Sequence, residues 1–195
     1  GNEEEKQKAL LSRDFEFSIT KQDDFKKIPG SPIAYYISNS VKSAFENFPS
    51  LKTHISPKQG TSTGDDETYV RYWHEVDFNE INFDSVGLED ALESEYVYFP
   101  LNKGGEYRKW FGNNEKVIKF GDGAYAQLLK IGNHLPSREL YFKKGITWSK
   151  ITSGSFSCRF DEGFVFSSVG LKGFPCPEDE DYILAFMNSK VMQYL

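Results

Sequence analysis

Short apolar runs separated by turn signals fill the chain from residue 140 to residue 170. The runs cover 145–148, 155–160 and 163–169, and Ser-Gly and Glu-Gly pairs lie between them. Runs of this length, punctuated by glycine, are typical of strands joined as hairpins. We therefore expect consecutive antiparallel strands in this region, each paired with the next.

Two longer patterns are helical. Apolar residues recur every three or four positions from 33 to 48, which predicts a helix with one apolar face. Ser31-Pro32 suits the start of this helix, and Pro49 ends it. A run of acids at 178–181 precedes an apolar run, which predicts a helix continuing to Leu195. Shorter elements are also expected: helices at 3–11, 88–94 and 124–131, and strands at 15–19, 69–73, 96–99 and 116–120.

Composition excludes several protein classes. The chain has 195 residues, and its 17 Phe and 11 Tyr supply enough apolar surface for a packed core, so wholesale disorder is excluded. No apolar run approaches 18 residues, so no membrane span is expected. The two cysteines, Cys158 and Cys176, argue against a disulfide framework and for a reducing compartment, and we expect a cytoplasmic protein.

Charge is distributed unevenly along the chain. The net charge is −6, yet residues 101–160 carry 11 basic and 4 acidic side chains, whereas 75–95 contains eight acids and no Lys or Arg. A basic face on an acidic body can attract a polyanion, because binding responds to the local field. The alternative is that these lysines and arginines only solvate strands rich in Phe and Tyr.

Familiar catalytic and metal motifs are absent from the sequence. The three histidines are scattered, no Cys/His pair has zinc-ligand spacing, and there is no Gly-Lys-Ser/Thr phosphate loop. The glycine-rich 60–64 segment lacks the Lys of a phosphate cradle. We assign no catalytic residue, no metal ligand and no cofactor-binding residue to this chain.

Two segments within the basic region combine Gly, cations and aromatic residues. They cover 102–110 and 141–150. Glycine lets the backbone approach a ligand, cations neutralise phosphates, and aromatic rings pack on sugars or bases. The alternative is a hairpin with a charged edge, where Lys discourages strand pairing. We expect Trp110 and Trp148 to belong to the core or to a groove wall.

An ordered set of motifs runs along residues 25–195. The motifs are Phe25-Lys-Lys-Ile-Pro-Gly-Ser-Pro-Ile-Ala-Tyr-Tyr36, Gln59-Gly-Thr-Ser-Thr-Gly-Asp65, Tyr69-Val-Arg-Tyr-Trp-His-Glu-Val76, Asn102-Lys-Gly-Gly-Glu-Tyr-Arg-Lys-Trp-Phe-Gly-Asn-Asn114, Lys144-Gly-Ile-Thr-Trp-Ser-Lys-Ile151, Phe156-Ser-Cys-Arg159 and Leu184-Ala-Phe-Met-Asn-Ser-Lys-Val191. This set resembles the C-terminal target recognition region of adenine-specific DNA methyltransferases. The similarity is greatest to the PglX-like, TaqI-like enzymes of BREX phage-defence systems, also described as type II restriction enzyme methylase subunits.

The resemblance implies a mixed α/β (α+β) fold, with a curved, mostly antiparallel sheet flanked by helices. It implies a linker or short helix at 1–24 and a DNA target recognition domain at 25–195, which we expect to be truncated at its C-terminus. The catalytic Asn-Pro-Pro-Tyr/Phe motif of such enzymes is absent. Adenine-N6 methylation with S-adenosylmethionine is therefore expected of another domain of the parent polypeptide, and this chain alone should be inactive.

The implied partners are double-stranded DNA, the catalytic domain of the same polypeptide and other defence-system proteins, without a membrane. Six lysines and arginines are expected to hold phosphates: Lys103, Arg108, Lys109, Lys143, Lys144 and Lys150. Five residues are candidates for base contacts: Gln59, Thr63, Ser155, Ser157 and Arg159.

Two other functions remain open from the sequence. The chain can be a protein–protein docking module of a defence complex, with the acidic 75–95 segment as its contact surface. A glycan-binding domain would also use exposed aromatic residues, and it predicts binding with little salt dependence.

Overall fold

The computed structural model describes residues 2–12, 19–33, 35–131, 134–152 and 154–194. The chain divides into two compact units, residues 1–51 and residues 52–195. The domain boundary expected after residue 24 stays a prediction. Among the described residues, no helix is long and apolar enough to cross a bilayer.

The first unit contains α1 (Glu3–Ser12), α2 (Gln22–Phe25) and α3 (Asn39–Asn47). Helix α1 confirms the prediction for 3–11, whereas most of the strand expected at 15–19 lies outside the described residues. The predicted start of α3 is wrong: Ser38 caps the helix by accepting the Val41 N–H at 3.4 Å, and Ser31 has a left-handed φ of 48° that a helix cannot accommodate. The helix ends before Pro49, as predicted.

The second unit contains two four-stranded sheets, so the α+β class is confirmed, with two sheets in place of one. The first sheet has the order β1 (Ile55–Lys58), β8 (Gly170–Pro175), β5 (Gly145–Ser149), β6 (Cys158–Asp161), and all its pairs are antiparallel. The second has the order β2 (Val70–Tyr72), β4 (Lys116–Lys119), β3 (Tyr98–Asn102), β7 (Val165–Phe166), and only β3–β7 is parallel.

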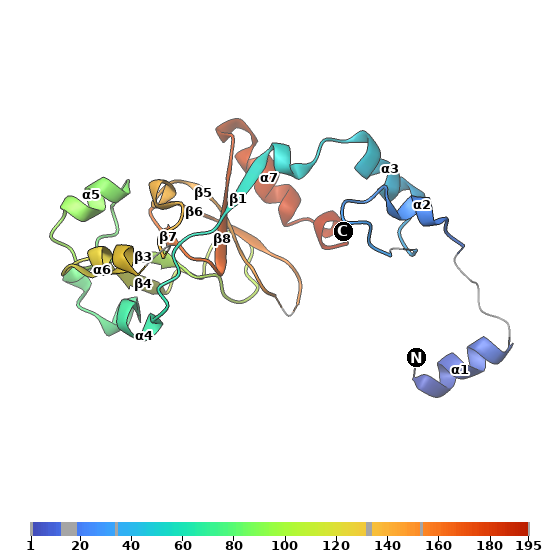
Figure 1. The fold of residues 1–195 in the computed structure, drawn as a ribbon, viewed down its shortest axis with the longest axis horizontal. Helices are drawn as coiled ribbons and strands as arrows, with labels where there is room; N and C mark the ends of the chain where they lie inside the picture. The colour runs from blue at the N-terminus through green and yellow to red at the C-terminus, as the bar shows by residue number, and fades with distance from the viewer. Residues whose placement is uncertain (1, 13–18, 34, 132–133, 153, 195) are drawn as a thin grey trace. The chain divides into compact units, whose positions relative to one another are not determined.

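Helices lie beside each sheet of the second unit. In Figure 1 the second sheet lies at one end of the unit with α4 (Asp66–Tyr69), α5 (Leu88–Glu93) and α6 (Ala124–Lys130). Helix α7 (Glu180–Met187) contacts β5 and β6 of the first sheet and leads into α8 (Lys190–Tyr194). The predictions for 88–94 and 124–131 are confirmed by α5 and α6.

The hairpin prediction for 140–170 is half right. Strands β5 and β6 form an antiparallel pair with Trp148 opposite Cys158. Strand β7, however, does not continue this hairpin and instead pairs in parallel with β3. Val165 and Phe166 are both completely buried there, so apolar burial in the second sheet outweighs pairing with the neighbouring strand in sequence.

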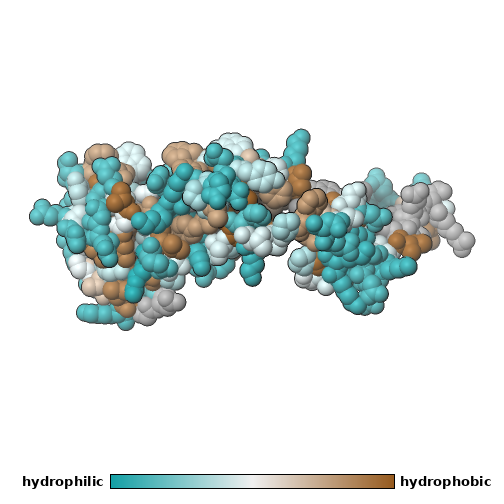
Figure 2. Space-filling model, turned by 90° about the horizontal axis from the view of Figure 1, so that it is seen from above, coloured by the Kyte–Doolittle hydropathy of each residue, from teal (hydrophilic) through white to brown (hydrophobic). Residues whose placement is uncertain are grey.

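Aromatic rings form the core around the second sheet. The Phe99 ring lies 6.0 Å from Phe120 and 5.9 Å from Phe142, and Tyr141 lies 5.5 Å from Phe166. The expectation that Phe and Tyr supply the core is confirmed. The outer surface is more polar than this aromatic core: the face of the second unit visible in Figure 2 is mainly hydrophilic, with small hydrophobic patches between the polar residues.

A buried polar network joins the two sheets. Asn102, at the end of β3, donates from Nδ2 to Thr147 Oγ1 at 3.1 Å and to Asp161 Oδ2 at 3.0 Å. The Lys172 ammonium of β8 forms an ion pair with the other oxygen of Asp161, and all four residues are at most 1% exposed. Charges this deeply buried must be paired, so the network fixes how β3 meets β5, β6 and β8.

Removing one charge of this network should be costly. Lys172→Met leaves Asp161 buried without its cation, which should cost about 3–5 kcal/mol of unfolding free energy at neutral pH. Burial already raises the pKa of the Asp161 carboxyl, although Lys172 and Asn102 oppose the shift. A carboxyl whose pKa is higher in the folded state than in the unfolded state favours folding while it is protonated, below its unfolded-state pKa. This stabilisation is lost as pH rises through its folded-state pKa.

The Lys172→Met variant should therefore regain stability as pH falls toward 4.5, measured by urea unfolding across pH. The double variant Asp161→Asn/Lys172→Met should lose this pH dependence. A Lys172→Met protein as stable as the original chain at pH 7 would contradict the importance of the ion pair.

The C-terminal helix is interrupted at Asn188, so the prediction of one continuous helix to Leu195 is wrong. The Asn188 side chain bonds to the backbone of Cys158 on β6: its Oδ1 accepts the Cys158 N–H at 3.1 Å, and its Nδ2 donates to the Cys158 carbonyl at 2.9 Å. The chain restarts as α8, where Ser189 Oγ accepts the Met192 N–H at 3.3 Å. Asn188 thus ties the end of α7 to the edge of the first sheet.

Asn188→Ala should destabilise the chain by about 2 kcal/mol, because it leaves the buried Cys158 N–H without its acceptor. Thermal unfolding followed by circular dichroism measures the loss. Gln59→Ala is the matched control, since this exposed amide should change stability by less than about 0.5 kcal/mol. Equal melting temperatures for the two variants would contradict this role of Asn188.

Candidate nucleic-acid interface

Residues 104–114, which we call the 104–114 loop, extend the first sheet beyond its edge strand β6. The loop begins directly after the network, where the Gly104 N–H donates to Asn102 Oδ1 at 3.1 Å. Trp110 then pairs with β6: its N–H donates to the Cys158 carbonyl at 3.2 Å, and its carbonyl accepts the Phe160 N–H at 2.9 Å. The loop is therefore positioned by the Asn102 side chain at its start and by backbone pairing at Trp110.

Aromatic and basic side chains of this loop reach the surface. Tyr107, Trp110 and Phe111 are 53%, 53% and 67% exposed, and the Arg108 side chain is 56% exposed. We call Tyr107, Arg108, Trp110 and Phe111 the loop surface. Trp110 is not a core residue, because its φ of 73° and its pairing with β6 leave half of the ring exposed.

The ion pair of Arg108 is weak. Its Nη1 lies 3.8 Å from Glu115 Oε1, and both side chains are about half exposed. Such exposed pairs contribute at most about 1 kcal/mol, so a phosphate can replace the carboxylate at little cost. Lys109 differs, because it is half-buried and its Nζ donates to the Asn188 carbonyl at 2.6 Å. Its main contact is with the end of α7.

The β5–β6 hairpin contributes further predicted residues next to the 104–114 loop. Lys150 and Ser155 are exposed in the connection between these strands. Ser157 is buried and accepts the Arg108 N–H at 3.2 Å, so it positions the loop. Arg159 is 1% exposed, and its Nη1 donates to the Arg108 carbonyl at 3.5 Å. In this conformation neither Ser157 nor Arg159 is open to a ligand.

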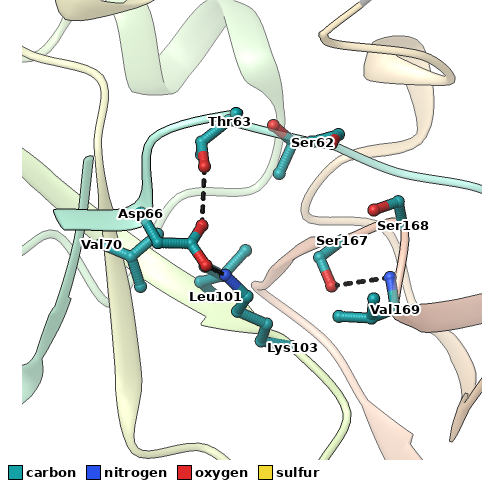
Figure 3. A pocket seen from close by; sticks show the side chains of 11 residues that line it. Ser62, Thr63, Asp66, Val70, Leu101, Lys103, Ser167, Ser168 and Val169 are labelled. Atoms are coloured by element: carbon teal, nitrogen blue, oxygen red, sulfur yellow. Dashed lines mark hydrogen bonds and ion pairs between the residues drawn. The ribbon is translucent and has the colours of Figure 1, made fainter. Parts of the chain in front are cut away.

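Two other predicted residues line a separate cavity of about 310 Å³. Figure 3 shows Thr63 and Lys103 both directed at Asp66. Thr63 Oγ1 donates to Asp66 Oδ1 at 2.6 Å, and the Lys103 ammonium forms an ion pair with Oδ2. Burial raises the pKa of the Asp66 carboxyl, but the bonds from Lys103 and Thr63 outweigh this and leave the pKa lowered. Lys103 is therefore neutralised here.

The remaining candidates do not lie together. Lys143 Nζ donates to the Val86 carbonyl at 3.1 Å, and Lys144 forms an ion pair with Glu180 at 2.5 Å. Gln59 is exposed at the end of β1. It precedes Gly60, where a Cβ would lie 1.9 Å from the Phe166 carbonyl oxygen. Gly60 thus serves close packing rather than phosphate binding.

Sequence reasoning predicted only Arg108 of the loop surface. It missed Tyr107 and Phe111, expected Trp110 in the core or a groove wall, and missed the carboxylates that neutralise Lys103 and Lys144. The three aromatic residues lie within three positions of Arg108 in sequence, so the signal was present in the motif itself. Asp66 and Glu180 lie 37 and 36 residues from their lysines, and no local pattern indicates such pairs.

The two cysteines should differ sharply in reactivity. Burial raises the pKa of the Cys158 thiol to about 12, whereas Cys176 is exposed. Because only a thiolate reacts, iodoacetamide at pH 8 should add one label per folded molecule, at Cys176. Cys176→Ser protein should remain unlabelled until it is unfolded in guanidinium, as mass spectrometry would show. Full labelling of this variant in the folded state would contradict the burial of Cys158.

No family model matches the chain, but two curated proteins do. The chain is 39% identical over 160 residues, 82% of its length, to the adenine-specific methyltransferase BrxX of Escherichia coli O9:H4 (strain HS). It is 38% identical over 149 residues, 72% of its length, to the adenine-specific methyltransferase PglX of Lacticaseibacillus casei (strain Zhang). The chain spans about 12% of the length of each. It is therefore related to a segment of BREX-like adenine-specific methyltransferases.

Proposed function

We propose that this chain is the DNA target recognition domain of an S-adenosylmethionine-dependent adenine-N6 DNA methyltransferase of a BREX or restriction-modification phage-defence system. The observation that carries the proposal is the loop surface, where Arg108 and three exposed aromatic residues lie on one loop at the edge of the first sheet. The names of the relatives, both adenine-specific methyltransferases, agree with DNA as the substrate of the parent protein.

The division of labour follows from the chemistry that each part offers. Arg108 and Lys150 are exposed cations that can pair with phosphates, and the loop aromatics can pack against sugars or an unstacked base. The sequence holds no Asn-Pro-Pro motif, so S-adenosylmethionine and the methyl transfer belong to another domain of the parent protein. That domain would extrude the target adenine from the duplex while this chain holds the flanking DNA.

Binding of duplex DNA should depend steeply on salt. The two phosphate contacts of Arg108 and Lys150 predict that affinity falls about 12-fold between 50 and 200 mM salt. Arg108→Ala/Lys150→Ala removes two cations and should reduce the slope of log affinity against log salt by about 2. Fluorescence anisotropy with a labelled duplex measures both quantities.

Lys58→Ala/Lys130→Ala is the charge-matched control. Both lysines are exposed, Lys58 on β1 at the opposite edge of the first sheet and Lys130 on α6. This control should leave the salt slope unchanged. Equal effects of the control and of Arg108→Ala/Lys150→Ala would mean nonspecific attraction and would contradict a DNA-binding loop surface. Binding that is insensitive to salt would favour the glycan-binding alternative.

The acidic segment supports a second candidate function, protein docking. Phe78 and Phe83 are 61% and 45% exposed, and their rings lie 5.3 Å apart within the 75–95 segment. An exposed aromatic pair among carboxylates suits a basic protein partner and repels DNA. Substitutions in this segment should leave DNA binding intact, so the two surfaces can be tested separately.

A further inference from the structure

Arg159 presents an unused hydrogen-bonding edge inside the protein. Its side chain is 1% exposed, and Nη1 donates to the Arg108 carbonyl at 3.5 Å. Its Nε and Nη2 have no hydrogen-bond partner among the residues that the structure describes. In a guanidinium, Nε–H and the adjacent Nη2–H point the same way and form a fork that matches two acceptor atoms. The unpaired atoms of Arg159 are this fork.

The charge around Arg159 is also unbalanced. Arg159 lies two positions before Asp161 on β6, so both side chains leave the same face of the strand. Asp161 is already paired with Lys172 and bonded to Asn102, which leaves it no full charge to offer Arg159. Two cations therefore share one buried carboxylate. A buried positive charge with unpaired donors is unfavourable, and protein structures rarely keep one without a use for it.

The cover over Arg159 is the 104–114 loop. Arg108 accepts its single hydrogen bond, and Trp110 pairs with its backbone in a parallel bridge. This loop holds two residues other than glycine in left-handed conformations, Trp110 at φ 73° and Asn113 at φ 62°. Such conformations are costly for residues with a side chain, so a rearrangement of the loop would release strain as it uncovers the guanidinium.

We propose that Arg159 is a DNA-binding residue held beneath the 104–114 loop, and that its Nε/Nη2 fork takes two acceptor atoms of DNA when the loop shifts. The inference rests on the proposed function. The acceptors belong either to a phosphodiester, which offers two oxygens, or to the O6 and N7 edge of guanine, since both match the fork. Arg159 would then add to the contacts that Arg108 makes from the same loop.

Stability and DNA binding of the Arg159→Met variant test the inference, in the native gene product that carries this chain. Methionine fills a similar volume without unpaired donors. The melting temperature without DNA should be equal to or above that of the original protein, while DNA affinity should fall about 10-fold or more. Arg159→Lys keeps the charge without the fork and should lose most of the same affinity. A melting temperature several degrees lower for Arg159→Met would overturn the inference, because it would make Arg159 a structural residue.

The possible outcomes distinguish a failure of the proposal for Arg159 from a failure of the proposed function. Unchanged DNA affinity in both variants, with normal binding by the original protein, would overturn the inference alone. Failure of the original protein to bind DNA at low salt would overturn the proposed function as well. A uniform loss of affinity across a random duplex library would identify a phosphate as the acceptor, whereas a loss confined to sequences with guanine at one position would identify the base.

Discussion

The buried network of Asn102, Thr147, Asp161 and Lys172 is the constraint on which the second unit depends. It is the point where β3 of one sheet meets three strands of the other, and each of its members is at most 1% exposed. Apolar packing holds the second sheet through its aromatic core, but apolar contacts are non-directional and allow several orientations. The Asp161 carboxylate accepts hydrogen bonds from both an ammonium and an amide, and these bonds require a defined geometry. The network therefore specifies one arrangement of the two sheets.

The candidate interface follows from this junction. Asn102 uses its amide nitrogen for the network and its oxygen to accept the Gly104 N–H, so the start of the 104–114 loop is fixed by the same side chain that joins the sheets. Backbone pairing of Trp110 with β6 then fixes the middle of the loop, and Asn188 fixes the end of α7 at Cys158, whose carbonyl accepts from both Trp110 and Asn188. The exposed Arg108 and its aromatic neighbours thus lie on a loop that is bonded to the sheets at Gly104 and at Trp110.

Local patterns in the sequence predict much of the fold and less of the site. The β5–β6 hairpin, α5, α6 and the strands near 98 and 116 follow from periodicity and turn residues. The parallel pairing of β7 with β3 could not be predicted this way, because it brings together residues more than 60 positions apart. The break at Asn188 depends likewise on a contact with distant Cys158.

Contacts between distant residues also decide which of the predicted basic residues are exposed and which are neutralised or buried. The sequence placed cations in the right region but could not show that Asp66 and Glu180 neutralise Lys103 and Lys144, or that Arg159 is buried. Charged residues are usually exposed, so burial of an arginine is a property of the assembled sheets and not of its neighbours in sequence. Of the loop surface, the sequence predicted only Arg108, because the exposure of its aromatic neighbours likewise depends on how the loop packs against β6.

Photocrosslinking would show whether DNA lies on the 104–114 loop. Duplex DNA carrying 5-iodouracil would be irradiated in complex with the protein, and the crosslinked peptides would be identified by mass spectrometry. We expect crosslinks to the aromatic residues of 104–114, with Tyr107, Trp110 and Phe111 as acceptors. Crosslinks confined to the 75–95 segment, or crosslinks scattered equally over exposed aromatic residues, would contradict it.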